Sequence, residues 1–141
     1  MVHALRRAHG LVQPSGCLVD IHPTADLAVM LVGDTPVGVV ESPAGAARHQ
    51  AAADAIAAAS DEGWFAVEGA SEFDFYTYGD TVEELRDFIL ANWRDTALAE
   101  DTVARARSLL APGVATRVRE RVAICRLVPR AMRPPRSVRP R

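Results

Sequence analysis

Asp20 and His22 close a short apolar segment and are the first residues of this sequence whose types could do chemistry. A histidine titrates near neutral pH and can serve as a base or as a ligand. Residues at the end of a parallel strand are the usual place for ligand contacts in open α/β sheets. We therefore predict Asp20 and His22 as candidate catalytic residues. The alternative is a loop histidine before Pro23 that only caps backbone groups.

A second group of candidates comes near the end of a long expected strand and in the helix that follows it. These four residues are Tyr76, Tyr78, Trp93 and Arg94. Aromatic side chains with a few polar neighbours often line small-molecule pockets, so we predict a ligand-binding role for them. The alternative is core packing, with the polar tips of the aromatic rings at the surface.

Motifs for other kinds of chemistry are missing from the sequence. It holds no H-E-x-x-H, no G-x-S-x-G, no Walker A motif and no cysteine–histidine spacing typical of zinc. Cys17 and Cys125 are expected to be reduced and buried in strands. Acidic residues at 80–84 belong to a helix start, where carboxylates interact favourably with the helix dipole. We expect no metal site and no cofactor.

Charge is distributed unevenly along the 141 residues. All 16 basic residues are arginines, and five of them follow position 128 in a segment without acidic residues. Residues 1–128 then carry eleven arginines against 18 acidic residues, a net charge of −7. We expect one domain at 1–128 and a disordered arginine- and proline-rich tail at 129–141. An acidic domain argues against binding to nucleic acid.

Hydropathy gives no sign of a membrane segment. The longest apolar run, residues 27–32, has six residues, too few to span a bilayer. No apolar stretch follows the N-terminal arginines as it would in a secretory signal. We therefore expect a cytoplasmic protein. The exclusive use of arginine and the many alanines are typical of a bacterial-type, high-GC coding bias.

Hydrophobic periodicity predicts an α/β fold in which helices pack on a small mixed sheet of about five strands. The alternative fold class is α+β. The expected helices cover residues 2–12, 44–62, a segment capped by Thr81, and 99–110. Ser42 is the expected N-cap of the second helix. The expected strands are 17–21, the two arms of an apolar hairpin at 27–40, 64–78 and 116–128.

Charges on the two longest strands predict that the strands are neighbours. One face of the first strand and one face of the last carry opposite charges: Glu68, Glu72 and Asp74 against Arg117, Arg119 and Arg121. Antiparallel pairing would place arginines across from carboxylates, at about 0.2–1 kcal/mol per pair, and would disfavour other registers. The alternative, an anion site, requires arginines without carboxylate partners.

The segment LVQPSGCLVDIHP at 11–23 resembles the later part of class I S-adenosylmethionine-dependent methyltransferases, where a leucine, a proline–glycine turn and a central strand follow one another. The later order of helix, strand, helices and a last antiparallel strand is similar, as are the Tyr-x-Tyr-Gly-Asp at 76–80 and the arginine-rich last strand. The resemblance covers most of the chain. The cofactor half has no counterpart, because the sequence contains no G-x-G.

The resemblance implies an accessory or interaction module without a cofactor site, since methyl transfer depends on a well-positioned cofactor. An exposed edge of the central strand must be covered, so we expect a homodimer or a partner that supplies the cofactor domain. Two alternatives remain. One is a small-molecule-binding enzyme with a pocket at the ends of strands 17–21 and 64–78. The other is a methyltransferase whose S-adenosylmethionine site is completed by another chain.

Overall fold

The computed structural model describes residues 2–131, so most of the tail predicted at 129–141 lies outside the described residues. Within them the chain forms four helices and a six-stranded sheet, which confirms the predicted α/β class. The elements follow in the order α1 (Val2–His9), β1 (Leu18–Pro23), β2 (Val29–Val32), β3 (Thr35–Glu41), α2 (Gly45–Asp61), β4 (Phe65–Gly79), α3 (Val82–Asn92), β5 (Ala97–Leu98), α4 (Glu100–Leu109) and β6 (Thr116–Pro129).

Strand β6 is the centre of the sheet. Along one edge it pairs with β4 over its full length, from Phe65↔Pro129 to Gly79↔Thr116. Its other edge is shared by two strands: β1 pairs with residues 122–127 and β2 with residues 116–119. Strand β3 continues the sheet beyond β2, and the two-residue β5 follows β3. Every pairing is antiparallel, so the expectation of a mixed sheet is wrong.

The position of β1 differs from the arrangement that the methyltransferase resemblance implies. β1 pairs with β6 and runs antiparallel to it, whereas the resemblance implies a central strand. Asp20 and His22 therefore do not stand at the end of a parallel strand, and that basis for selecting them is wrong.

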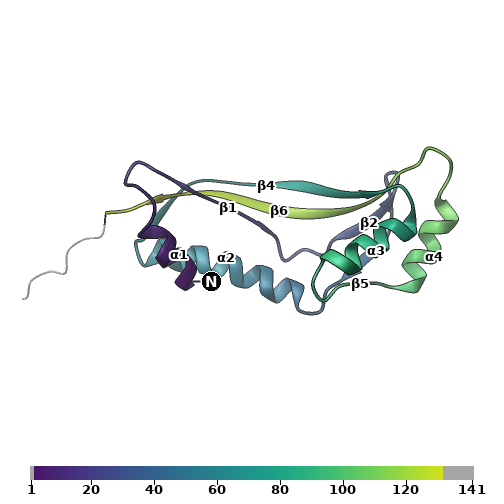
Figure 1. Cartoon of the computed structure of the whole chain (residues 1–141), viewed down its shortest axis with the longest axis horizontal. Helices are drawn as coiled ribbons and strands as arrows, with labels where there is room; N and C mark the ends of the chain where they lie inside the picture. The colour runs from purple at the N-terminus through teal and green to yellow at the C-terminus, as the bar shows by residue number, and fades with distance from the viewer. Residues whose placement is uncertain (1, 132–141) are drawn as a thin grey trace, which may run out of the picture.

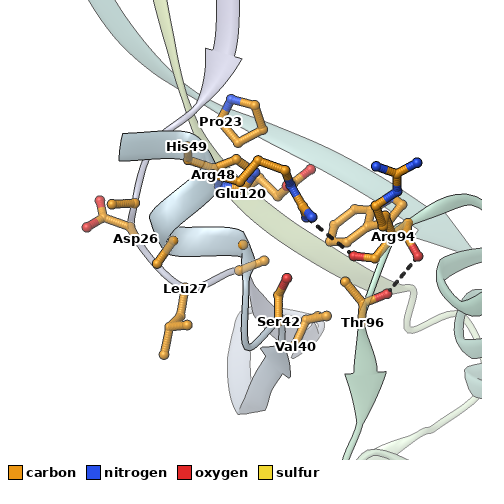
Figure 2. A pocket seen from close by; sticks show the side chains of 15 residues that line it. Pro23, Asp26, Leu27, Val40, Ser42, Arg48, His49, Arg94, Thr96 and Glu120 are labelled. Carbon is orange, nitrogen blue, oxygen red and sulfur yellow. Dashed lines mark hydrogen bonds between the residues drawn. The ribbon is translucent and has the colours of Figure 1, made fainter. Parts of the chain in front are cut away.

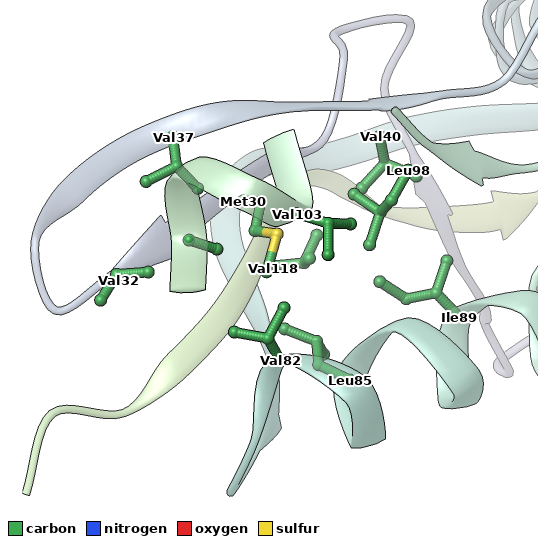
Figure 3. Packing of buried hydrophobic residues seen from close by; sticks show 11 residues of the cluster. Met30, Val32, Val37, Val40, Val82, Leu85, Ile89, Leu98, Val103 and Val118 are labelled. Atoms are coloured by element: carbon green, nitrogen blue, oxygen red, sulfur yellow. The ribbon is translucent and has the colours of Figure 1, made fainter. Parts of the chain in front are cut away.

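Two hydrophobic cores lie at opposite ends of the long β4–β6 ribbon. The first packs α3, α4, β2 and β3 around Val118 of β6, and Figure 3 shows its side chains. The second packs α1 and α2 against Phe65 and Leu127. Val118 and Leu127 are an odd number of positions apart, so they face opposite sides of β6. Since both helix groups lie on the same side of the ribbon in Figure 1, the ribbon twists between them.

Both ends of the ribbon are thereby covered, while its middle is not. Residues 68–75 of β4 are all exposed, on both faces of the strand. The register shifts between Val67 and Gly69. The middle of the ribbon is thus where the cores leave room for other contacts.

The predicted charge pairing between β4 and β6 is confirmed in part. Asp74 lies directly opposite Arg121, whose Nε is 3.1 Å from Glu72 and whose Nη1 is 3.1 Å from Asp74. Arg126 is 2.9 Å from Glu68. Of the three arginines named from sequence, Arg121 meets carboxylates of β4, whereas Arg117 pairs with Asp34 and Arg119 has no ion-pair partner within residues 2–131.

Helix starts were predicted with mixed success. Thr81 caps α3 as expected, because its Oγ1 accepts a 3.0 Å hydrogen bond from the Glu84 N–H. The Glu84 carboxylate in turn accepts a bond from the N–H of Asp80, one residue before the cap. The prediction that Ser42 caps α2 is wrong. The N-cap is Ala44, which has no side chain to accept a bond, and Ser42 instead belongs to the preceding turn through a bond from Gly45 N–H to its carbonyl.

The predicted hairpin at 27–40 is present, with a two-residue turn. Val32 pairs with Thr35, so only Gly33 and Asp34 form the turn, and Gly33 has a φ of 56° that favours glycine. None of the helices in residues 2–131 combines the length and apolarity needed to cross a membrane.

Candidate functional site

A cleft of about 270 Å³ opens where β1 ends and β2 begins on the shared edge of β6. β1 stops at Pro23, opposite Val122, and β2 joins at Val29, opposite Arg119. Two positions of β6 therefore have no strand beside them on this edge. The connecting segment 24–28 runs past them and is held by a 2.8 Å bond from the Thr24 N–H to the carbonyl of Arg121.

The cleft has apolar walls that carry a few polar groups, which is the usual composition of a ligand pocket. The apolar residues come from both sides of the break in the sheet: Pro23, Ala25, Leu27, Ala28, Val40, Gly45, Ala46 and Trp93. The polar residues are Asp26, Ser42, Arg48, His49, Arg94, Thr96 and Glu120. Figure 2 shows how α2, β3, the end of α3 and β6 bring them together.

Glu120 is the polar residue that β6 contributes. It lies on the same face of the strand as Val118 and Val122, both of which are buried. Burial raises the pKa of the Glu120 carboxyl, because a charged group loses hydration in an apolar setting. Among residues 2–131 no side chain is within ion-pair or hydrogen-bonding distance of this carboxyl. A perturbed carboxyl in a cleft is a candidate functional group.

His49 projects from the first half of α2. Its Nδ1 lies 3.0 Å from the carbonyl of Thr24. A carbonyl only accepts, so Nδ1 must carry the proton, and in the neutral ring Nε2 is then an acceptor. The contact ties α2 to the segment that closes the gap in the sheet, and it fixes the orientation of the imidazole.

Arg48 links α2 to the loop that follows α3. Its Nη1 donates to the carboxylate of Asp95 at 3.3 Å and its Nη2 to the carbonyl of Arg94 at 3.4 Å. Asp95 adopts a φ of 55°, which turns the chain back after Trp93. These contacts place Trp93 and Arg94 on the wall of the cleft. The Arg94 guanidinium has no ion-pair partner within the described part of the chain.

Of the residues predicted from sequence, Trp93 and Arg94 line this cleft. Asp20 and His22 do not. The Nδ1 of His22 lies 2.5 Å from the Asp20 carboxylate, so the two side chains satisfy each other on one face of β1. Only the next residue, Pro23, reaches the cleft.

Tyr76 and Tyr78 also lie elsewhere. They share one face of β4, with ring centroids 6.2 Å apart, and the Arg117 guanidinium lies 5.0 Å from the ring centre of Tyr76. Tyr78 is 59% exposed. The two tyrosines thus form a surface stack with an arginine. This arrangement is nearer to the alternative interpretation from sequence, in which the polar tips of the aromatic rings lie at the surface, than to a ligand pocket. They do not form a pocket with the end of β1.

Sequence reasoning missed Glu120, His49 and Arg48. One signal for Glu120 was present: it interrupts the apolar alternation of Val118 and Val122 on the last expected strand. No comparable signal exists for His49 and Arg48, because their role depends on where α2 meets the segment after β1. In residues 2–131 no cluster of three or more histidine, cysteine, aspartate or glutamate side chains could hold a metal ion.

Comparison with known proteins gave no match to a family model, to a curated protein or to a solved structure. The resemblance to the later part of methyltransferases stays a prediction. The functional argument therefore depends on the geometry of the chain itself.

Proposed function

We propose that this protein binds a small organic molecule in the cleft between its two cores. The observation that carries the proposal is Glu120, an inward-facing carboxyl on the central strand without a partner in residues 2–131. A polar group that is partly buried and not hydrogen-bonded destabilises the fold. An apolar residue would serve a purely structural strand better, so a carboxyl here points to a ligand.

The proposal keeps the small-molecule alternative from the sequence but changes its residues. Trp93 and Arg94 remain in the site. Glu120, His49 and Arg48 take the places of the residues predicted on β1 and β4. The arrangement supports binding more directly than catalysis, because most polar groups of the cleft hold the protein's own backbone or side chains in place.

Ligand-observed NMR with a set of neutral, acidic and amine fragments of about ten to fifteen non-hydrogen atoms tests this function. Ala46 is exposed and lines the cleft, whereas Ala53 is exposed on the same helix and does not line it. Leucine is a good helix former, so Ala46→Leu should fill the cleft without disturbing α2. We expect saturation transfer to a subset of fragments, lost in Ala46→Leu and kept in Ala53→Leu. Equal transfer in both variants would place the binding elsewhere.

A second candidate function, the accessory or interaction module that forms a homodimer, is favoured by a different surface. The open face is the uncovered side of the sheet opposite α1 and α2, with Val19, Ile21, Phe73, Phe75 and Ile124. The first four of these side chains are 40–59% exposed. Contiguous apolar surface of this kind marks interaction sites.

A second copy of the chain suits the open face because the face is self-complementary. Beside the large side chain of Phe73 lies a shallow hollow over Gly69, Ala70 and Ser71. Two copies related by a two-fold axis would each place large residues into the other's hollow. Phe75 lies directly opposite Glu120 on β6, so the open face reaches the border of the cleft.

A further inference from the structure

We propose that the ligand of the cleft is a small zwitterion of the apolar amino-acid class, with its ammonium group on Glu120 and its carboxylate on Arg94. The inference rests on the proposed small-molecule function and specifies the chemistry of that same site. The apolar part of the ligand would lie against Trp93, Val40 and Leu27, which line the cleft.

Some polar groups of the cleft are already held by contacts within the protein, and others remain available to a ligand. Arg48 is held by Asp95, and the Nδ1 of His49 is held by the carbonyl of Thr24. The Thr96 hydroxyl donates to the carbonyl of Trp93 at 3.1 Å. Within residues 2–131, the charged side chains that line the cleft and have no ion-pair partner are Asp26 and Arg94, which are both exposed, and Glu120, which is partly buried. Arg94 and Glu120 carry opposite charges.

A ligand with a single charge would satisfy only one of the two groups, the Arg94 guanidinium or the Glu120 carboxyl. An organic anion would pair with Arg94 and leave the Glu120 carboxyl without a partner in a cleft that the ligand has closed to water. An organic cation would do the reverse. Charge-assisted hydrogen bonds are about twice as strong as neutral ones, and a buried charge without a partner is strongly unfavourable. A zwitterion satisfies both groups together.

The volume of the cleft limits the size of the ligand. A volume of about 270 Å³ corresponds to about nine waters at roughly 30 Å³ each, and so to a molecule of about ten non-hydrogen atoms. This lies at the lower end of ligand pockets. A free amino acid with a branched or aromatic apolar side chain has this size, and its apolar part matches the walls.

Calorimetric titration of the full chain with three probes tests the charge requirement. The probes are L-phenylalanine, phenethylamine, which lacks the carboxylate, and 3-phenylpropanoate, which lacks the amine. We expect L-phenylalanine to bind at least 10-fold more tightly than either analogue. In Glu120→Gln, L-phenylalanine should weaken at least 10-fold while 3-phenylpropanoate is unchanged. In Arg94→Gln, L-phenylalanine should weaken similarly while phenethylamine is unchanged.

Matched controls are Glu62→Gln and Arg7→Gln, which change exposed residues outside the cleft and should leave all three affinities unchanged. Equal affinity for the three probes, or L-phenylalanine binding that neither cleft variant weakens, would overturn the zwitterion. Absence of binding by all three would also overturn it. If fragments then still bind in a manner that Ala46→Leu abolishes, the small-molecule function stands without this inference, and if they do not, both fail.

Discussion

Glu120 holds a carboxyl in a place where the rest of β6 is apolar. Burial raises its pKa above the usual value of 4.5, so the folded protein holds this proton to a higher pH than the unfolded chain does. Stability contributed by this proton is therefore lost as pH rises through the folded pKa, and the full penalty of the ionised group is present at neutral pH.

Glu120→Gln should consequently stabilise the unliganded protein at pH 7. The side chain is only partly buried, so we expect less than about 1 kcal/mol, or up to about 4 °C in Tm for a chain of this size. Well below pH 4.5 the carboxyl is protonated in both states, so the difference should shrink as pH falls toward this value. Thermal unfolding of both proteins between pH 4 and pH 8 measures this, and a constant difference across the range would contradict the assignment.

Gly38 on β3 is a position where the fold requires the absence of a side chain. A Cβ there would lie 2.2 Å from Oγ1 of Thr102, which is buried on α4. Gly38→Ala should destabilise the protein by about 1–3 kcal/mol through overpacking. Gly69 has no atom near the corresponding position, so Gly69→Ala is the control. Urea unfolding of the two variants should differ, and equal stability would mean that β3 and α4 do not pack as described.

At the scale of elements, the β4–β6 ribbon depends on register, and its charges make that register testable. Arg121→Glu would place a third carboxylate beside Glu72 and Asp74. We expect a loss of stability, from two lost pairs and from like-charge repulsion, and a smaller loss in 1 M salt because exposed charges are screened. Urea unfolding at low and high salt measures it. Arg7→Glu, on α1, is the control for a simple change in net charge.

Most elements could be predicted from the sequence because their signals are local. The cap at Thr81 and the apolar hairpin at 27–40 each follow from the chemistry of a few neighbouring residues. The pairing of β4 with β6 was predictable because charges on both strands had to match. The two-residue β5 gives no periodic pattern, and it was missed.

The arrangement of the strands was not predictable in the same way. No local pattern in residues 17–23 predicts that β1 pairs antiparallel with residues 122–127 of β6. The cleft exists because two strands share one edge of β6 and leave a gap opposite Glu120. For that reason Glu120 and His49 were not predicted from sequence, and the ligand-binding role of Trp93 and Arg94 stays a prediction.

At the scale of the whole molecule, two cores joined by a twisted ribbon leave apolar surface on the open face. We expect a dimer of twice 15.2 kDa in light scattering at about 100 µM. Ile21→Ser with Phe73→Ser should convert it to a monomer that keeps its helical circular dichroism, because both side chains are largely exposed. Leu11→Ser, at an exposed residue away from the open face, should remain dimeric. A monomeric wild-type protein at this concentration would contradict the homodimer.

The most direct test of the central claim is to map amide chemical shifts of the full chain during titration with the strongest fragment. The account predicts saturable shifts that cluster on Leu27, Ala46, His49, Thr96 and Glu120, with the indole N–H of Trp93 among them. Shifts confined to the open face around Ile21 and Phe73, or no saturable shifts near the cleft, would contradict a ligand site between the two cores.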